Sequence, residues 1–412
     1  MMTYDVLIIG GGAAGLAASV FLGRAGQGRR IAVLEKGPRV GKKLMATGNG
    51  TCNLTNIKAT AADYHGAPRL ADAALSTFSV AETMDFFTSI GVDCAVREDG
   101  KVYPLSEQAG AVLDALRLEA QACGVEMICD CKVTALKQQG SDWCVLCDNA
   151  KYVAKQVLVT VGGAAAPALG GSAEGYRLLT DLGCEKKPLF PSIVQVRTAT
   201  DFVRAVKGIR VDAALTLRTD GRVAAESQGE VLFTEYGLSG PAVMFVSRIV
   251  ADWERQKRGE VTACLDLLPD WDSDKLLSRI RQRSGLKGRT LEDLLTGLLH
   301  KRVGQTVLRV AEVLPLTREV ESLTEEEIAR IVKTMKNWKL PVTGTQGFGG
   351  AQVTAGGIAA TEIEPSTFAV KRLPGVYAAG EVLDVDGNCG GFNLQFAWSS
   401  AYVASQAIIH NW

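Results

Sequence analysis

One stretch near the N-terminus, residues 4–35, constrains the fold more than any other part of this 412-residue chain. An apolar run at 6–9 ends in the glycine turn GGGAAG, and an alanine-rich helical pattern and a second apolar run follow. Glu35 then stands twenty residues after Gly15. Strand, glycine turn, helix, strand and acid in this order form the dinucleotide-binding fingerprint. The stretch predicts a Rossmann unit, and a glycine-rich turn without function is the alternative.

Each residue of the fingerprint has a physical task. Gly10 permits the tight turn, Gly12 lets backbone amides approach a pyrophosphate, and Gly15 lets the helix pack closely on the strand. The pyrophosphate then lies at the positive end of the helix. Glu35 can accept hydrogen bonds from a ribose diol.

Composition narrows the function classes. Lys plus Arg and Asp plus Glu number 45 each, and no basic tail or stripe appears, which argues against a nucleic-acid partner. No apolar run approaches the ~18 residues that span a bilayer, so we expect no membrane partner. The apolar stretch at the N-terminus lacks the basic leader of a secretory signal. Ten cysteines without a secreted-type framework favour reduced thiols and a cytoplasmic location.

Two cysteine pairs could suggest a metal site: Cys129 with Cys131, and Cys144 with Cys147. Both lie in strand-like sequence, where residues three apart point to opposite faces of the strand. We therefore expect buried, inert thiols and no metal.

Two helices and several short strands follow the fingerprint. Ser79 and Glu82 form a capping box that begins one helix, and Ser106 is expected to begin the next. The apolar run 157–161 is typical of a buried parallel strand. An antiparallel meander is expected from four shorter runs: residues 125–128, 132–136, 143–146 and 152–153.

A second glycine-and-acid motif near the C-terminus indicates FAD rather than NAD. The segment GVYAAGE repeats the pattern of a strand followed by glycine and acid, ending in Gly380 and Glu381. In two-part FAD proteins a late strand closes the flavin site, and its terminal acid binds the ribityl chain. The helix expected from about Asn393 to Ile409 would point its first amides at the flavin's pyrimidine edge, which is negatively charged when reduced.

Between these motifs the pattern changes twice. Short strand patterns with an Asp220-Gly221 hairpin turn come first, and helical patterns with a Thr324 and Glu327 capping box come next. Because the C-terminal motif completes the first domain, the middle of the chain is an insertion. We expect three parts: a discontinuous FAD-binding domain (1–190 and 346–412), an inserted β-rich domain (191–270) and an inserted helical subdomain (271–345).

Three further segments carry a resemblance to a known family: GKKLMATGNGTCNLTN (41–56), EVLFTEYGLSGP (230–241), and QVTAGGI with GVYAAGEVLDVDGNCGGFNLQFAWSSA (352–401). With the fingerprint they resemble the YhiN/BaiN-like flavoproteins, also labelled the aminoacetone oxidase family, over nearly the whole chain. The resemblance implies an α/β fold. A glutathione-reductase-like FAD/NAD(P)-binding Rossmann domain would be interrupted by the β-rich and helical domains.

The resemblance also implies which residues contact FAD. The ADP half would be held by Gly10, Gly12, Ala13, Ala14, Gly15, Glu35 and Lys36. The path to the flavin would be lined by Lys42, Lys43, Thr47, Gly48, Asn49, Gly50, Cys52 and Asn53. The adenine side would be formed by the backbone of Val133, with Gly162 and Gly163 closing the dinucleotide side. The ribityl chain and ring would be surrounded by Gly380, Glu381, Asp386, Gly391, Asn393, Leu394 and Gln395.

Two positions depart from the family pattern. Thr51 stands where the family usually has Arg, which weakens the expectation of a fixed cation near the flavin. Glu235 stands where it usually has His, which removes an obvious imidazole acid–base. The three histidines, at 65, 300 and 410, lie outside the motifs, so we expect surface or packing roles for them.

These motifs do not identify a catalytic residue. Tyr236, in a glycine-marked loop, is a candidate proton donor, with a packed loop aromatic as the alternative. Arg97 and Tyr103 are similar candidates. Cys52 has no second cysteine at relay spacing, so we expect a packing or flavin-contact residue and not a redox thiol.

The sequence therefore predicts an FAD-dependent oxidoreductase that exchanges a hydride at flavin N5 with a small organic substrate. Some relatives in the resembled family reduce conjugated steroid enones, so an NAD(P)H-dependent enone reductase is the leading hypothesis. The segment 157–171 is interrupted by Pro167, so NADH or NADPH would stack transiently at the flavin rather than occupy a second Rossmann unit. The alternatives are an amine or aminoketone oxidase that uses oxygen and a non-enzymatic electron carrier or redox sensor. Flavin-dependent RNA modification fits the fold but not the neutral charge, and the oligomeric state stays open.

Overall fold

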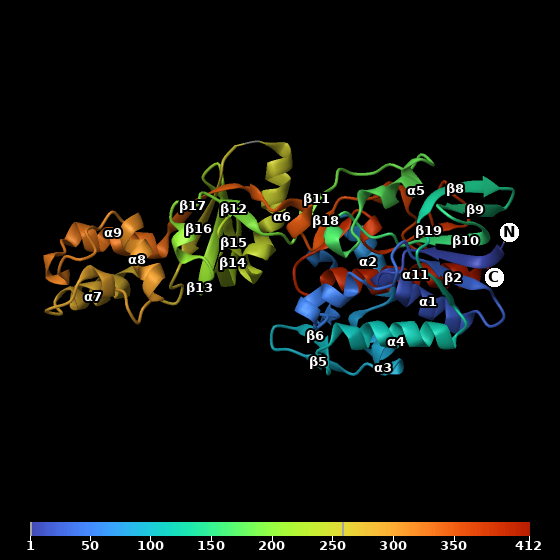
Figure 1. Cartoon of the computed structure of the whole chain (residues 1–412), viewed down its shortest axis with the longest axis horizontal. Helices are drawn as coiled ribbons and strands as arrows, with labels where there is room; N and C mark the ends of the chain where they lie inside the picture. The colour runs from blue at the N-terminus through green and yellow to red at the C-terminus, as the bar shows by residue number, and fades with distance from the viewer. Residues whose placement is uncertain (1, 258) are drawn as a thin grey trace. The chain divides into compact units, whose positions relative to one another are not determined.

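Two separate hydrophobic cores divide the chain into two units (Figure 1). The computed structural model describes residues 2–257 and 259–412. Unit 1 comprises the residues up to Pro191 together with Gln352–Trp412, and unit 2 comprises Ser192–Ala351.

Unit 1 is built on a seven-stranded sheet of order β7-β2-β1-β10-β9-β8, with β19 also paired to β10. Strands β7, β2, β1, β10 and β19 run parallel, whereas β8, β9 and β10 form antiparallel pairs. The carboxyl ends of the parallel strands therefore lie at one edge, where α/β sheets bind ligands. The strands are β1 (Met2–Ile9), β2 (Ile31–Leu34), β7 (Glu126–Ile128), β8 (Val133–Gln139), β9 (Asp142–Cys147), β10 (Lys151–Val159) and β19 (Val376–Ala378).

Two parts of the predicted meander are wrong. Residues 126–128 form β7, which pairs in parallel with β2 and does not join the antiparallel hairpins. The run 152–153 and most of the run 157–161, expected as two strands, belong to the single strand β10, which ends at Val159. One end of β10 pairs with β9 and the other end with β19, so one strand serves both the hairpins and the parallel sheet.

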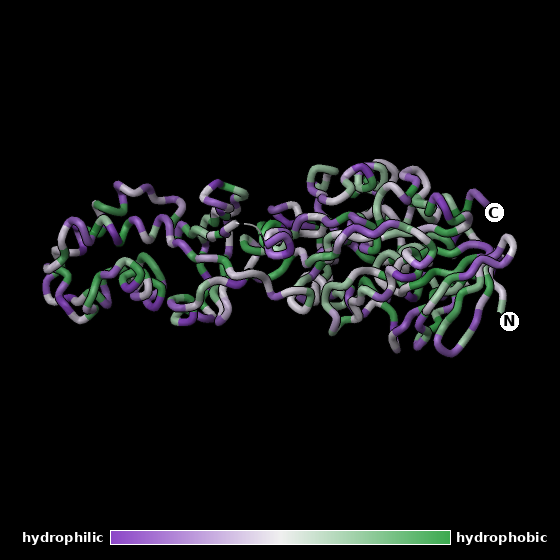
Figure 2. Tube along the Cα trace, turned by 90° about the horizontal axis from the view of Figure 1, so that it is seen from above, coloured by the Kyte–Doolittle hydropathy of each residue, from purple (hydrophilic) through white to green (hydrophobic). Residues whose placement is uncertain are grey.

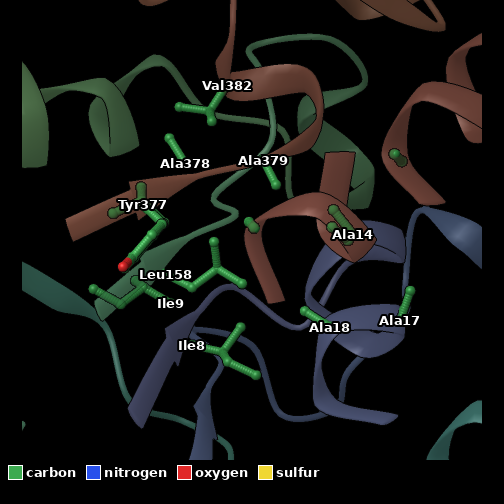
Figure 3. Close-up of a cluster of buried hydrophobic side chains, with 14 of the residues drawn as sticks. Ile8, Ile9, Ala14, Ala17, Ala18, Leu158, Tyr377, Ala378, Ala379 and Val382 are labelled. Carbon is green, nitrogen blue, oxygen red and sulfur yellow. The ribbon is translucent and has the colours of Figure 1, made fainter. Parts of the chain in front are cut away.

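Small side chains let helix α1 (Ala13–Ala25) lie close to the sheet. Figure 3 shows Ala18 beside Ile8 of β1 and Leu158 of β10, and Ala14, Ala17 and Ala18 are all buried. Helix α1 also packs on the buried helix α11 (Phe392–His410), which spans the C-terminal helix predicted from the sequence. The Phe21 ring of α1 meets the Tyr402 ring of α11 edge-on, with ring centroids 5.2 Å apart.

The remaining elements of unit 1 surround this framework. The Ser79–Glu82 capping box is confirmed, whereas the next helix has Gln108 as its N-cap rather than Ser106. The other helices are α2 (Pro68–Thr77), α3 (Val80–Ser89), α4 (Ala109–Ala122) and α5 (Arg177–Thr180). The short strands are β3 (Thr55–Asn56), β4 (Tyr64–Gly66), β5 (Cys94–Val96), β6 (Lys101–Pro104), β11 (Phe190–Ser192), β18 (Val353–Ala355) and β20 (Val385–Gly387).

Unit 2 contains a closed barrel of order β12-β15-β14-β13-β16-β17. The predicted Asp220-Gly221 turn joins β13 to β14, and both residues have positive φ, as a two-residue hairpin requires. Helix α6 (Pro241–Gln256) packs on β14 and β17. The strands are β12 (Val196–Thr198), β13 (Arg210–Thr219), β14 (Arg222–Phe233), β15 (Gly237–Ser239), β16 (Val261–Asp266) and β17 (Trp338–Thr345).

Three helices interrupt the barrel between β16 and β17: α7 (Ser273–Ser284), α8 (Lys301–Val310) and α9 (Glu325–Lys336). The capping box of Thr324 and Glu327 begins α9 as predicted. Residues 338–345, expected in the inserted helical subdomain, instead form barrel strand β17, which pairs with β16 and β12. Figure 2 shows hydrophobic and hydrophilic residues alternating along the three helices, as expected of helices with one buried face.

The fold predicts that alanine costs more stability at Gly15 than at Gly12. A Cβ at Gly15 would overlap the Gly10 carbonyl oxygen and lie 2.8 Å from Thr160 Oγ1, whereas a Cβ at Gly12 would meet no atom within 4 Å. Gly15→Ala should therefore lower the free energy of unfolding by about 1–3 kcal/mol, and Gly12→Ala by no more than about 1 kcal/mol. Chemical denaturation of the cofactor-free protein measures both. Equal unfolding midpoints for the two variants would contradict this packing.

Candidate cofactor site

Loops that follow four parallel strands converge at the carboxyl edge of the unit 1 sheet. Gly10 follows β1, Glu35 follows β2, Thr160 follows β10, and Gly380 comes two residues after the end of β19. Thr160 Oγ1 donates to the carbonyl oxygens of Ile9 and Gly10 at 3.0 and 2.8 Å, which ties the first and third loops together. The sheet thus brings together motifs that lie hundreds of residues apart.

The fingerprint forms an open cradle at the start of α1. Gly10 has φ +107°, and a Cβ there would lie 2.5 Å from the Thr160 carbonyl oxygen. Gly12 is the N-cap of α1, and no side chain caps this end of the helix. The first amides of α1 therefore have no intrahelical acceptor and face the space that Gly12 leaves open. Such an end suits an anionic group such as a pyrophosphate.

Glu35 is held in place by backbone amides. Its Oε2 accepts from Gly11 N and its Oε1 from Gly37 N, each at 2.8 Å. The side chain remains partly exposed. A carboxylate can accept about four hydrogen bonds, so two positions are left for a ribose diol.

The strand and loop that follow β7 border Glu35. Cys131 N donates to the Glu35 carbonyl oxygen at 2.9 Å, and the half-buried Val133 begins β8. The β8–β9 hairpin also places Cys131 Sγ 3.2 Å from Cys147 Sγ. These two free thiols come one from each of the two cysteine pairs that stand close in the sequence. Burial and this neighbour raise the pKa of the Cys147 thiol.

An ion pair joins the two ends of the predicted flavin path. Lys43 Nζ lies 2.6 Å from Glu381 Oε2, and Glu381 Oε1 accepts from Thr354 N at 2.9 Å. Both charged side chains are partly exposed. Lys43 therefore supplies a fixed cation in this region, although Thr51 stands where the family usually has Arg.

The loop after Lys43 presents backbone to solvent. Gly48 and Asn49 have φ +57° and +56°, and Gly50 has φ +91°. Thr47 Oγ1 donates to the Leu44 carbonyl oxygen at 2.7 Å, which anchors the loop at its start. Residues 48–50 are exposed, so this loop can contact a ligand without rearranging the core.

The C-terminal segment contributes a second helix N-terminus, that of α11. Helix α11 has Gly391 as its N-cap and no side-chain cap. The Asn393 side chain is turned back into the preceding loop, where Oδ1 accepts from Gly387 N at 2.8 Å and Nδ2 donates to Gly387 O at 2.9 Å. Asn393 and Leu394 are partly exposed, so their amides in the first turn can face a ligand.

Accessibility divides the predicted contact residues into two groups. The partly or fully exposed group comprises Gly10, Gly12, Ala13, Glu35, Lys36, Lys42, Lys43, Thr47, Gly48, Asn49, Gly50, Val133, Gly162, Glu381, Gly391, Asn393 and Leu394. The buried group comprises Ala14, Gly15, Cys52, Asn53, Gly163, Gly380, Asp386 and Gln395. Members of the buried group pack beneath the exposed ones and support their position, as Gly380 does by lying against Ala14.

Three of the residues predicted to contact the cofactor, Cys52, Asp386 and Gln395, expose none of their surface in this structure. Gln395 Nε2 donates to Thr83 Oγ1 and Ser399 Oγ, each at 2.8 Å, and its Oε1 accepts from Thr55 Oγ1. Its amide is thus fully used inside unit 1. Burial also raises the pKa of the Cys52 thiol to about 11, so the thiol is protonated at neutral pH and is a weak nucleophile.

Residues from β4 and β6 lie beside these loops, which the sequence motifs did not indicate. His65 of β4, expected outside all motifs, has its Nε2 3.1 Å from Asn388 Oδ1 in the loop before α11. A Cβ at Gly48 would lie 3.4 Å from the Tyr103 ring, and a Cβ at Gly390 would lie 3.3 Å from Lys101 Cε. Tyr103 therefore lies next to the loop at Gly48, and Lys101 lies next to the loop at Gly390. Tyr103 was already a candidate from the sequence, whereas Lys101 was not.

The segment after β10 does not continue as a second Rossmann unit. Residues 167–169 form a single short 3-10 turn, η3 (Pro167–Leu169), and a Cβ at Gly171 would overlap the Ala165 carbonyl oxygen. A tight loop of this kind leaves no long helix whose N-terminus could receive a second pyrophosphate.

Tyr236 and Glu235 belong to unit 2, in the turn between β14 and β15. Tyr236 is partly exposed, and Glu235 is exposed and forms an ion pair with Lys207. His300 is the N-cap of α8, where its Nδ1 accepts from Arg302 N at 3.3 Å, which agrees with a structural role.

Across residues 2–257 and 259–412, no helix combines the length and apolar character needed to cross a bilayer.

Comparison with known proteins agrees with this architecture. The chain matches the family described as HI0933-like protein Rossmann domain over residues 4–407. It is 33% identical over 402 residues to a 3-dehydro-bile acid delta(4,6)-reductase of Clostridium scindens, covering 97% of this chain and 98% of the relative. It is 28% identical over 413 residues to the ribosomal RNA dihydrouridine synthase of Escherichia coli, covering 99% of each.

A solved structure shares the fold at low identity. A 3-ketosteroid delta1-dehydrogenase from Sterolibacterium denitrificans superposes over the full length of both chains with a TM-score of 0.55 and 12% identity. The α/β Rossmann-type fold predicted from the sequence is thus confirmed. The chain belongs to the HI0933-like Rossmann family, the YhiN/BaiN-like group of FAD-dependent oxidoreductases that its motifs resemble.

Proposed function

We propose that this protein is an FAD-dependent reductase of carbon–carbon double bonds conjugated to a carbonyl group, with NADH or NADPH as electron donor. The observation that carries the proposal is the exposed set of residues at the carboxyl edge of unit 1. It combines an uncapped helix N-terminus at Gly12, an acid at Glu35 and a second uncapped N-terminus at Gly391.

These residues would serve successive parts of an FAD molecule. The first turn of α1 would hold the pyrophosphate and Glu35 the adenosine ribose. The Lys43–Glu381 pair would hold the ribityl region, and the first amides of α11 would face the ring. When bound, FAD supplies hydride exchange at its N5 position.

Reduction of a conjugated double bond also needs an acid. The α carbon must receive a proton as the β carbon receives the hydride. We assign this task to Tyr103, because its ring adjoins the exposed loop at Gly48 and its strand adjoins the loop at Gly390 through Lys101. Burial raises the pKa of the Tyr103 hydroxyl and the Lys101 ammonium opposes that rise, so the hydroxyl carries its proton at neutral pH.

The named activities of two relatives support this reaction class. A 3-dehydro-bile acid with double bonds at positions 4 and 6 is a conjugated ketone. Uridine likewise has a ring double bond conjugated to a carbonyl, and its reduction gives dihydrouridine. The two names differ in the size and charge of the substrate but share the bond that is reduced. The higher identity to the bile-acid enzyme makes a small conjugated ketone the leading substrate for this chain.

Two other functions make different use of the same cofactor. An amine or aminoketone oxidase would pass its electrons to oxygen, and a carrier or sensor would pass them to another protein. Neither requires a proton donor beside the ring, so the effect of Tyr103→Phe distinguishes the reductase from both.

FAD binding should depend on Gly12 and Glu35. In Gly12→Ala a methyl group fills the space reserved for the pyrophosphate, so FAD affinity falls while the fold persists. Glu35→Ala removes a charge-assisted contact of about 1.5–3 kcal/mol, so FAD affinity falls about 10- to 150-fold. FAD titration of the cofactor-free variants measures both effects, with circular dichroism as the folding check. Asp181→Ala, an exposed carboxylate of unit 1, is the control; equal FAD affinity in all four proteins would exclude this site.

Anaerobic half-reactions test the reaction class. The oxidised protein is reduced with NADPH or NADH and then mixed with a conjugated steroid ketone, with a uridine-containing ribosomal RNA fragment, or with oxygen. We expect the ketone to restore oxidised flavin and to be recovered with its conjugated double bond reduced. Tyr103→Phe should slow this step by about a hundredfold or more and leave reduction by the nicotinamide unchanged. Reoxidation by RNA alone would move the substrate to ribosomal RNA, and reoxidation by oxygen alone would replace the reductase with an oxidase.

A further inference from the structure

Unit 2 contains an open polar pocket of about 770 Å³ that the proposed flavin chemistry does not use. Strands β12 and β17 and two connecting segments of the barrel form its walls. Its lining includes three cationic side chains, Arg197, Arg204 and Lys207, against one carboxylate, Glu235, and Tyr236 supplies an aromatic face. A pocket with an excess of cations suits an anionic ligand.

The cations stand on a rigid support. The short helix η5 (Val203–Val206) buries Val203 and Val206 completely, which leaves Arg204 exposed on its outer side. Arg302 of α8 fixes this segment from outside the pocket, because its Nε donates to the Ala205 carbonyl oxygen at 3.0 Å. Arg204 and Lys207 are therefore presented by anchored backbone rather than by a free loop.

The tyrosine stands on an equally well-fixed turn. Thr234 N donates to the Gly237 carbonyl oxygen at 2.8 Å, and Gly237 N donates to Thr234 Oγ1 at 3.1 Å. Thr198 N of β12 donates to the Tyr236 carbonyl oxygen at 3.1 Å. The turn thus holds Glu235 and Tyr236 at the pocket without relying on a ligand.

Two of the three cations at the pocket form ion pairs with carboxylates, and among the described residues the third does not. Arg197 lies 2.8 Å from Glu254, whose other oxygen accepts from Thr345 N, so this cation is neutralised within the barrel. Lys207 pairs with Glu235. Arg204 has no carboxylate at ion-pairing distance among residues 2–257 and 259–412.

Glu235 itself shows which chemistry the cations accept. Lys207, and more weakly Arg204, hold the pKa of the Glu235 carboxyl below its usual value. An exposed carboxylate at the tip of a turn thus already occupies part of the cationic surface. An oxyanion from solution could take the same position, with Arg204 as an additional donor that geometry suits to carboxylate or phosphate.

We propose that this pocket binds the oxyanion of a ligand, a phosphate or a carboxylate, through Arg204 and Lys207, with Tyr236 against the ring that carries the oxyanion. Glu235 then acts as an internal competitor that the ligand displaces from Lys207. The site lies within unit 2 and does not depend on the proposed reductase function.

Calorimetric titration of the full-length oxidised protein tests this site. The probes are inorganic phosphate, uridine 5′-monophosphate with uridine as its neutral counterpart, and cholate as a steroid carboxylate. We expect saturable binding of at least one ring-bearing oxyanion, and weaker binding of uridine than of its monophosphate. Preference for uridine 5′-monophosphate identifies a phosphate ligand, and preference for cholate identifies a carboxylate ligand.

Two of the variants should change oxyanion affinity in opposite directions. Arg204→Gln should weaken oxyanion binding about tenfold or more, because a charge-assisted hydrogen bond is lost. Glu235→Gln should strengthen binding about two- to five-fold, since Lys207 is released from an exposed ion pair. Tyr236→Ala should weaken binding of the ring-bearing oxyanion and leave binding of inorganic phosphate unchanged. Arg222→Gln, an exposed arginine at the far hairpin turn, is the matched control.

Two results would overturn the proposal. One is the absence of saturable binding by every oxyanion probe in the wild type. The other is wild-type affinity in both Arg204→Gln and Glu235→Gln. Because the titration needs no turnover, it remains decisive even if the flavin half-reactions fail.

Discussion

The close approach of α1 to the sheet at Gly10 and Gly15 is the contact on which the candidate cofactor site depends. There is no room for a Cβ at Gly15 beside the Gly10 carbonyl oxygen. Because these backbones touch, the first turn of α1 lies directly at the carboxyl edge of β1 and keeps its amides without side-chain caps. The same contact aligns the turn with Glu35, which binds Gly11 N from the next strand. Packing and ligand binding are thus two results of one glycine pattern.

The C-terminal segment completes the site by returning to this contact. Gly380, at φ +75°, lies against Ala14 in the first turn of α1, and its amide donates to Ser400 Oγ of α11 at 3.0 Å. The next residue, Glu381, reaches Lys43 across 338 positions of sequence. Unit 2 is inserted between the two halves of unit 1, so the flavin side cannot form until the chain after the insertion has folded back. The insertion of unit 2 accounts for the long sequence separation of the two glycine-and-acid motifs.

The sequence predicted what local chemistry determines and missed what distant packing decides. The fingerprint, the two capping boxes and the Asp220-Gly221 turn are short patterns whose geometry follows from their own residues, and the structure contains all of them. The pairing of β7 with β2, and of β17 with the barrel after a long helical excursion, depends on contacts that no short window contains.

The same distinction holds for the site. Gly10, Glu35 and Gly380 follow parallel strands at the carboxyl edge of the sheet, where the two glycine-and-acid motifs led us to expect them. Gln395 is buried among hydroxyl groups from α3 and β3, partners that sequence spacing cannot reveal. His65 and Tyr103 reach the site through short strands with no motif of their own. Their places follow from tertiary contacts with the loops at Asn388 and Gly48.

The central claim is that the carboxyl edge of unit 1 holds FAD, and the nucleotide content of the purified protein tests it most directly. The protein is purified without added cofactor, its visible spectrum is recorded, and the nucleotide released on denaturation is identified by chromatography and mass. The account predicts a flavin spectrum and FAD as the released nucleotide, close to one per chain. A colourless protein that takes up no FAD on reconstitution, or one that releases a nicotinamide nucleotide instead, would contradict it.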